Sequence, residues 1–256
     1  MATRIAIITG ASSGIGKATA IRLAKDFTGL VLVARREDEL AETAKMLKLL
    51  GVEPLIIPID LRLPSAGDTV IKKTLEMFGQ LHTLVNIAGA VPQIHLFEMT
   101  DEQWNDGAEM KLHGARRLTI KAWSLLKESK GNVVFISGNS AEVPKPGFAA
   151  VATINAAICA LAKAFAEEGI LCGIQVNSVL PGAVMTDRRK KFLEKFAEAN
   201  NLSMEEAKMK FLREAKIERY GEPQEIAELI AFLVSPRAQW MTGTALRIDG
   251  GEVKSI

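Results

Sequence analysis

Short apolar runs and longer amphipathic stretches alternate along the whole chain. The short runs, rich in β-branched residues, predict strands at Ile5–Thr9, Leu30–Val33, Leu55–Ile59, Thr83–Asn86, Asn132–Ser137, Gly173–Val179 and Ala245–Ile248. The amphipathic stretches predict helices at Ile15–Asp26, Asp38–Leu50, Ser65–Phe78, Asp101–Glu128, Phe148–Glu168 and Pro223–Val234. Because the strands are apolar on both faces, helices must cover both sides of their sheet. The alternation therefore predicts an α/β fold with a doubly wound, parallel sheet of about seven strands.

A single domain is expected, because residues 1–256 contain no linker, repeat or break in composition. One segment, at about residues 185–220, interrupts the alternation with additional helix after the sixth strand. It follows the carboxyl end of a strand, where open α/β sheets bind their ligands. We expect this segment to form a lid over a substrate site.

Composition excludes several classes of partner. The formal net charge of +2 gives no reason to expect nucleic acid or a membrane surface. The N-terminus runs straight into the first strand without the regions of a signal peptide, and we expect no apolar run of the ~20 residues that cross a bilayer. These features indicate a cytoplasmic protein. The histidines are scattered without the spacing of metal ligands, so no metal site is expected.

A glycine-rich turn follows the first strand and reads T-G-A-S-S-G-I-G over residues 9–16. Glycines permit a tight turn and let backbone N–H groups approach a pyrophosphate at the start of a helix. Such a cluster alone is often only a turn. Directly after the first strand of an alternating α/β chain, it indicates a dinucleotide-binding site.

The end of the second strand decides between the two nicotinamide dinucleotides. An acidic residue there would bind the ribose 2′-hydroxyl and repel a 2′-phosphate. This chain has Arg35 and Arg36 instead, and Arg35 is placed for a charge-assisted contact with the phosphate. The alternative is that both arginines are simply solvated. Because Arg35 is suitably placed and the acidic residue is absent, we expect NADP(H) as the cofactor.

Several motifs in the same order resemble the short-chain dehydrogenase/reductase family over essentially the whole chain. They are the turn at residues 9–16, Asp60, N-I-A-G at 86–89, P-G-A-V-M-T at 181–186, and T-G at 242–243 through D-G-G at 249–251. The resemblance implies a Rossmann-type fold, with Asp60 at the adenine, Asn86 at the adenosine ribose and residues 181–186 at the nicotinamide. Together with Arg35, the expected cofactor contacts are Gly10, Ser12, Ser13, Gly14, Ile15, Gly16, Asp60, Leu61, Asn86, Ala88, Gly89, Pro181, Gly182, Val184 and Thr186.

The family's usual proton relay of Ser, Tyr, Lys and Asn does not match this chain. Alignment with the family pattern puts Gly138 at the serine, Val151 at the tyrosine, Asn155 at the lysine and Lys111 at the asparagine. Misalignment does not remove the difference, because the only tyrosine is Tyr220 and no Tyr-x-x-x-Lys occurs.

An exchanged pair of residues is the most specific hypothesis for the proton relay. Lys111 falls on an apolar helix stripe, where an ammonium is costly without a partner. We expect it to meet Asn155, which restores one amine and one amide beside the nicotinamide ribose; alternatively, its head reaches solvent. The candidate catalytic residues are Lys111, Ser137 and Asn155, with Ser140 a further hydroxyl nearby.

Two classes of function remain open at this point. The first is an NADP(H)-dependent oxidoreductase acting on a carbonyl or alcohol of a small-molecule substrate, with a rearranged or weakened relay. The second is a non-catalytic NADP(H)-binding subunit or sensor. The basic run Arg188–Lys191 is either a solvated helix face or a contact for an anionic ligand. The resemblance also implies a homodimer or homotetramer.

Overall fold

One parallel sheet organises the molecule. The computed structural model describes residues 3–255 and contains seven parallel strands in the order β3-β2-β1-β4-β5-β6-β7. Their bounds are β1 Ile5–Thr9, β2 Gly29–Ala34, β3 Glu53–Pro58, β4 Thr83–Asn86, β5 Asn132–Ile136, β6 Gln175–Pro181 and β7 Ala245–Ile248. Each strand overlaps its expected range, and the predicted doubly wound, Rossmann-type sheet is confirmed.

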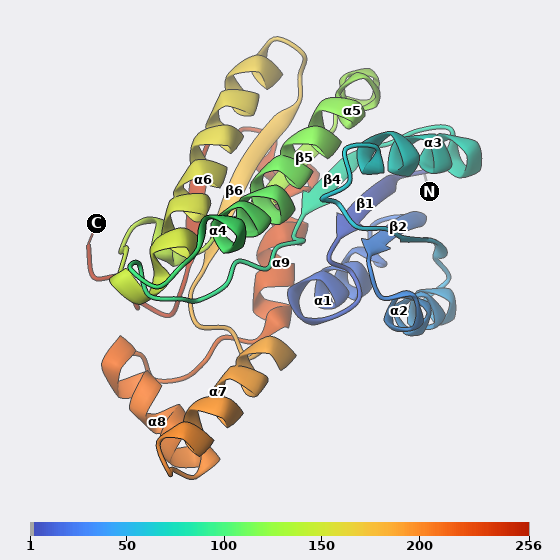
Figure 1. Ribbon diagram of the computed structural model, residues 1–256. Helices are drawn as coiled ribbons and strands as arrows, with labels where there is room; N and C mark the ends of the chain where they lie inside the picture. Colours follow the sequence, from blue (N-terminus) through green and yellow to red (C-terminus); the bar gives the residue numbers. More distant parts are fainter. Residues whose placement is uncertain (1–2, 256) are drawn as a thin grey trace.

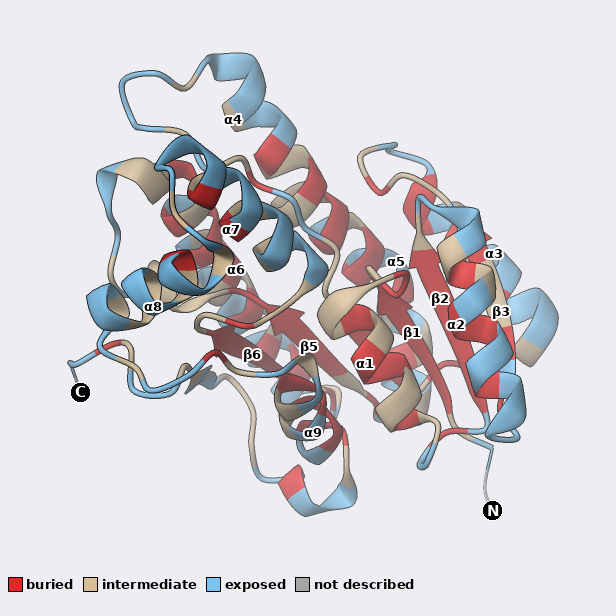
Figure 2. Ribbon diagram, turned by 90° about the horizontal axis from the view of Figure 1, so that it is seen from below, coloured by how far each residue is buried: buried red, intermediate tan, exposed pale blue. Residues whose placement is uncertain are grey.

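Helices cover both faces of this sheet (Figure 1). One layer consists of α1 Gly14–Leu23, α2 Glu37–Leu49 and α9 Pro223–Leu233, whose apolar residues share a core with one face of the strands. The opposite layer consists of α3 Ala66–Phe78, α5 Gly114–Ser129 and α6 Ala149–Ile170. Most strand residues are buried between the two layers (Figure 2), as the apolar runs require.

The long helix expected at Asp101–Glu128 is interrupted. It begins as α4, Asp101–Ala108, behind a capping box in which the Thr100 side chain accepts from the backbone N–H of Gln103. A π-helical turn, η1 at Glu109–His113, then separates α4 from α5. Such single π turns occur frequently at functional sites. This one carries Lys111.

The additional segment after β6 folds into two helices, α7 Asp187–Ala199 and α8 Met204–Ala215, which project from the body of the molecule (Figure 1). Their apolar side chains pack mainly on each other rather than on the sheet. The buried centre of this cluster is Leu193, Ala197, Ala207 and Tyr220. Because they form the segment expected to be a lid, we refer to α7 and α8 as the lid helices.

One stretch in the described residues, Pro146–Ile170, is long and apolar enough to span a membrane by length and composition. The expectation that no such run exists is wrong by that measure. The stretch contains α6, which lies on the sheet with Ile158, Ala162 and Ala166 buried in the core. Packing against the sheet accounts for its apolar composition.

Candidate active site

The glycine-rich turn lies between the end of β1 and the start of α1. A Cβ at Gly16 would stand 2.1 Å from the carbonyl oxygen of Gly10, so only glycine permits this close approach of backbone. Gly14 has a φ of +52°, which also favours glycine. The Thr9 hydroxyl accepts from the backbone N–H groups of Ile87 and Ala88, both at 2.9 Å, and so joins this turn to the end of β4.

A cavity of about 410 Å³ opens beside this turn. Most of the residues expected to contact the cofactor line it: Gly10, Ser12, Ser13, Gly14, Ile15, Gly16, Arg35, Leu61, Ala88, Gly89 and Thr186. We call it the dinucleotide cavity. It runs from the arginines after β2 to Lys111 and Arg188 at its other end.

Both arginines after β2 line the dinucleotide cavity. Arg35 is mostly exposed, and its Nη1 lies 4.0 Å from Oδ2 of Asp60. Arg36 donates from Nη2 to the hydroxyl oxygens of Ser12, at 3.3 Å, and Ser13, at 3.1 Å. The guanidinium of Arg36 therefore also contacts the glycine-rich turn. From the sequence, a phosphate contact was expected for Arg35 alone.

Two of the expected contact residues that do not line this cavity, Asp60 and Asn86, are engaged elsewhere. Arg62 donates to both carboxylate oxygens of Asp60, and these hydrogen bonds lower the pKa of that carboxyl below its usual range. The side chain of Asn86 is buried and donates from Nδ2 to Oγ1 of Thr119 at 3.0 Å. The structure thus turns the Asn86 amide towards α5 and the Asp60 carboxylate towards a neighbouring arginine.

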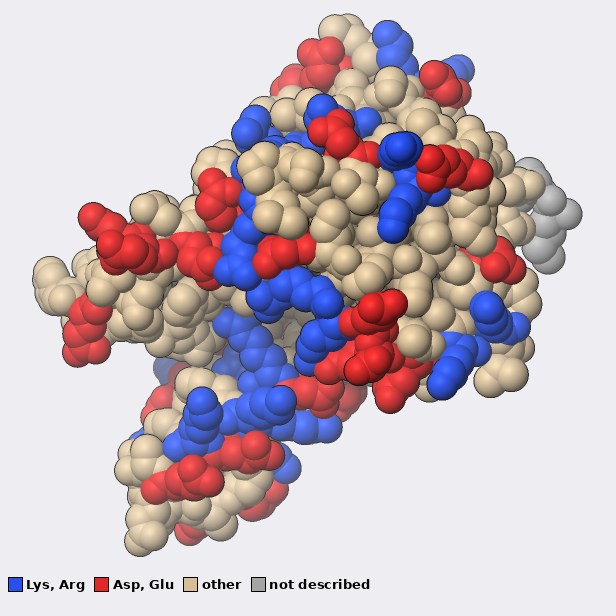
Figure 3. Space-filling model, turned by 45° about the vertical axis from the view of Figure 1, so that its right-hand side comes forward, with Lys and Arg blue, Asp and Glu red and all other residues tan. Residues whose placement is uncertain are grey.

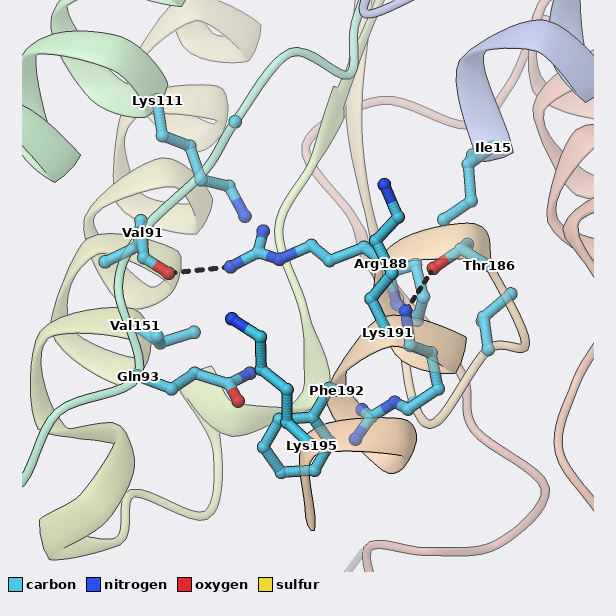
Figure 4. A pocket seen from close by; sticks show the side chains of 15 residues that line it. Ile15, Val91, Gln93, Lys111, Val151, Thr186, Arg188, Lys191, Phe192 and Lys195 are labelled. Atoms are coloured by element: carbon cyan, nitrogen blue, oxygen red, sulfur yellow. Dashed lines mark hydrogen bonds between the residues drawn. The ribbon is translucent and has the colours of Figure 1, made fainter. Parts of the chain in front are cut away.

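A second cavity of about 490 Å³ lies between the end of β6, η1 and α7 (Figure 4). Three expected residues of the motif after β6, Pro181, Gly182 and Val184, line it. It shares Ile15, Gly89, Lys111, Thr186 and Arg188 with the dinucleotide cavity. We call it the substrate cavity, because it meets the dinucleotide cavity at the end opposite to Arg35.

Lys111 stands at the junction of the two cavities. Its Nζ donates to the carbonyl oxygen of Ser137 at 3.0 Å and to Oδ1 of Asn155 at 2.5 Å. A Cβ at Gly89 would lie 2.9 Å from the lysine Cδ, so the glycine provides the space for this stem. Burial, together with the charge of Arg188, lowers the pKa of Lys111 to about 8. An amine with this pKa can donate or accept a proton near neutral pH.

Asn155 and Ser137 hold the amine in place. Nδ2 of Asn155 donates to Oγ of Ser140 at 2.9 Å, which fixes the amide with its oxygen towards Lys111. The Ser137 hydroxyl donates to the Asn155 carbonyl oxygen at 2.8 Å and is buried. Ser137 therefore acts on the cavities only indirectly: its backbone carbonyl oxygen accepts a hydrogen bond from Lys111, which lines both of them.

A third cavity of about 380 Å³ lies on the other side of Asn155, under α8. Gly138, Ser140, Val151 and Tyr220 are among its lining residues. The Tyr220 hydroxyl is itself buried, without a hydrogen-bond partner in the described part of the chain, and burial raises its pKa. The only tyrosine of the chain is therefore poorly suited to donate a proton.

Sequence reasoning missed the cationic side chains that α7 contributes beyond the basic run. Lys195 lines the substrate cavity together with Arg188 and Lys191. These residues are spaced i, i+3 and i+7, which places them on one face of a helix. The spacing was readable in the sequence once residues 187–199 were assigned to a helix.

The chain is similar to known reductases over nearly its whole length. A family model described as enoyl-(acyl carrier protein) reductase matches residues 10–252. The 3-oxoacyl-[acyl-carrier-protein] reductase of Staphylococcus aureus is 29% identical, over 97% of this chain and 98% of that protein. L-sorbose reductase from Gluconobacter frateurii, complexed with NADPH and L-sorbose, is 31% identical, with a TM-score of 0.95 over 100% of this chain and 98% of the other. A variant of actinorhodin polyketide ketoreductase with NADPH is 32% identical, with a TM-score of 0.92 over 98% and 97%.

Proposed function

The chain belongs to the short-chain dehydrogenase/reductase family, and from this premise we propose that it reduces the carbonyl group of a small-molecule substrate, with Lys111 as the proton donor. It is an NADP(H)-dependent oxidoreductase, as its similar structures are. The observation that carries the proposal is the position of the Lys111 amine, held by Ser137 and Asn155 where the two cavities meet.

The residues of the dinucleotide cavity fit a bound NADP(H). The close backbone approach at Gly10 and Gly16 exposes N–H groups at the start of α1, where a diphosphate binds. Arg35 and Arg36 provide two guanidinium groups for the 2′-phosphate at the end of β2. In this proposal the nicotinamide lies at the opposite end, near Thr186 and Lys111.

Asp60 and Asn86 have altered roles in the proposal. The Asp60 carboxylate holds Arg62, so the backbone around Leu61 is left to contact the adenine. Asn86 fixes the start of the loop at residues 87–89, because its side chain is hydrogen-bonded to Thr119 of α5. Both residues then act by positioning the walls of the cavity.

Lys111 can protonate the substrate oxygen without giving up its existing contacts. An ammonium has three N–H donors, and two are used by Ser137 and Asn155. The third is free to donate to a carbonyl oxygen in the substrate cavity. When bound, NADPH supplies the hydride for the carbonyl carbon. Lys111 supplies the proton for the oxygen, and the product is the alcohol.

The proposed relay keeps the chemistry of the family with other side chains. A general acid is typically worth about 10²–10⁴-fold in rate. The amine replaces the tyrosine hydroxyl as that acid, while Asn155 and Ser137 act as positioning residues. The Ser140 hydroxyl accepts from Asn155, and Ser140 lines the third cavity.

A screen of ketones, aldehydes and alcohols with NADPH and NADP⁺ tests the proposal. We expect turnover with a subset of carbonyl compounds, and a loss of about 10²–10⁴-fold in kcat for Lys111→Met at unchanged NADPH affinity. Turnover that survives in this variant would exclude Lys111 as the proton donor. NADPH binding without turnover on any compound would favour the non-catalytic subunit or sensor instead.

We also propose a cytoplasmic homodimer or homotetramer. In the family, helices equivalent to α4–α5 and α6 meet between subunits, and here these helices form one outer layer of the molecule. Light scattering of the purified protein measures this state directly, and a monomer at micromolar concentration would contradict it.

A further inference from the structure

The substrate cavity is lined by cations and by no carboxylate. Its cationic side chains are Lys111, Arg188, Arg189, Lys191 and Lys195, and no Asp or Glu is among the described residues that line it. Figure 3 shows Lys and Arg side chains gathered around a hollow between the projecting part of the molecule and its body. A cavity with this lining has a strongly positive potential.

These cations lack carboxylate partners inside the described part of the chain. None of the five lies within 4.0 Å of a carboxylate oxygen, whereas Lys190 on the same helix pairs with Asp187 at 3.9 Å. Arg188 instead donates from Nη2 to the carbonyl oxygen of Val91 at 2.8 Å (Figure 4). A neutral partner orients the guanidinium but leaves its charge uncompensated.

Glu252, a carboxylate that stands close to the lining residue Gly182, is already engaged. Oε2 of Glu252 accepts from Nδ2 of Asn139 at 2.7 Å and from the backbone N–H of Ala183 at 3.2 Å. It lines the third cavity rather than the substrate cavity. Mutual repulsion is visible within the cluster, since the charge of Arg188 contributes to lowering the pKa of Lys111.

The phosphates of the cofactor do not account for the whole cluster. Arg188 lines both cavities, so a cofactor diphosphate can neutralise it. Lys191 and Lys195 line only the substrate cavity. In Figure 4 the amine of Lys195 points towards the guanidinium of Arg188, which lies between it and Lys111. These two lysines are exposed to solvent and are not needed to neutralise the cofactor, so both are available to a second anion.

We propose that the substrate is an anionic carbonyl compound, with a carboxylate or phosphate held by Lys195 and Arg188 while its carbonyl oxygen faces Lys111, and with Lys191 adding positive charge to the wall of the same cavity (Figure 4). This inference rests on the proposed function and names the substrate class of the same site. The remaining lining includes Val91, Val151 and Phe192, which suit a short carbon chain between the two groups. Such a cluster also attracts anions from solution and raises their rate of association.

Two matched pairs of probes test the proposal by binding, independently of turnover. Calorimetry on the NADP⁺-saturated protein, which cannot reduce a carbonyl, compares acetoacetate with methyl acetoacetate, and dihydroxyacetone phosphate with dihydroxyacetone. Each pair differs only in the anionic group. We expect at least one anion to bind at least tenfold more tightly than its neutral counterpart, and the pair that shows this separates a carboxylate from a phosphate. The preference should shrink as ionic strength rises.

Lys195→Met should weaken binding of the preferred anion about tenfold and leave the neutral probe unchanged. Lys190→Met is the matched control, because this lysine is exposed, paired with Asp187 and absent from the cavity lining. Equal affinities within both pairs, no binding of either anion at millimolar concentration, or a preference that survives Lys191→Met combined with Lys195→Met would each overturn the inference.

The carbonyl screen separates this inference from the proposed function. A protein that reduces neutral carbonyls best, with Lys111-dependent turnover, keeps the proposed function and rejects the anionic substrate. A protein that binds the anions through Lys195 but oxidises no NADPH keeps the anion site and rejects the reductase.

Discussion

Nζ of Lys111 lies 2.5 Å from Oδ1 of Asn155, and this contact joins the π turn η1 to α6 at the point where the two cavities meet. The pair places an amine and an amide together. Because Asn155 is also fixed by Ser140, the lysine is held by a short network rather than by a single contact.

Stability should respond to the protonation of Lys111. Its pKa is lowered from 10.5 to about 8, so between these values the unfolded chain binds more protons than the native protein. The free energy of unfolding therefore rises with pH through this window. We expect the wild type to gain about 1–3 kcal/mol relative to Lys111→Met between pH 7 and pH 10. Urea unfolding at several pH values measures the difference, and a constant difference would contradict a lowered pKa.

The rate of carbonyl reduction should also depend on whether Lys111 is protonated. If the Lys111 ammonium is the general acid, kcat/KM for reduction falls above about pH 8, by tenfold per pH unit, and the reverse oxidation gains. The charged and titratable groups facing the amine are Arg188 from α7, which lowers its pKa, and Cys159 from α6, which raises it. Replacing Arg188 with Met should therefore move the alkaline limb upwards. A limb that persists unchanged in Lys111→Met belongs to another group.

Cofactor preference should depend on Arg35. The guanidinium is mostly exposed beside the dinucleotide cavity, where a charge-assisted contact with the 2′-phosphate is expected. We expect Arg35→Ala to weaken NADPH binding by about 10–100-fold and to leave NADH binding unchanged, since a charged hydrogen bond contributes about 1.5–3 kcal/mol. Fluorescence titration of both nucleotides tests this. Lys25→Ala, on the surface away from both cavities, serves as the charge-matched control.

Tyr220 should be dispensable for turnover. Its hydroxyl is buried without a partner among the described residues, and its pKa is raised by burial, so it neither donates readily nor gains a hydrogen bond. Removing an unsatisfied buried hydroxyl relieves a desolvation cost. Tyr220→Phe should keep kcat within about twofold and leave the free energy of unfolding equal or about 1 kcal/mol higher. A large loss of kcat would mean that this hydroxyl reaches the substrate when the lid helices move.

The sequence predicted the fold better than it predicted the site. The central strands such as β1 and β2 were recognisable because they are apolar runs buried on both faces, and the glycine-rich turn was recognisable because its spacing is local. The interruption at Glu109–His113 was not, since residues 101–128 carry an unbroken helical period and the contacts of Lys111 with Ser137 and Asn155 are tertiary. The engagement of Asp60 by Arg62 was missed for a different reason, because a family motif marks a position but not its partner.

Restoring the family's serine at Gly138 should damage the site. The backbone there is extended, so a side chain causes no backbone strain, but a Cβ would lie 2.6 Å from Nδ2 of Asn155. The Asn155 amide must then move, and it would release Ser140 and the Lys111 amine together. We expect Gly138→Ser to lower kcat by at least tenfold with little change in NADPH affinity.

Gly147→Ser, at a glycine with no neighbour within 4 Å of an added Cβ, is the control for a new hydroxyl and should have no effect. An increase in kcat for Gly138→Ser would show instead that a relay of the kind usual in the family works beside Lys111. In that case the exchanged amine and amide would be supporting groups rather than the proton donor and its holder. The change in kcat is negative in the first outcome and positive in the second. Steady-state kinetics of Gly138→Ser, with Gly147→Ser as the control, therefore decides between them.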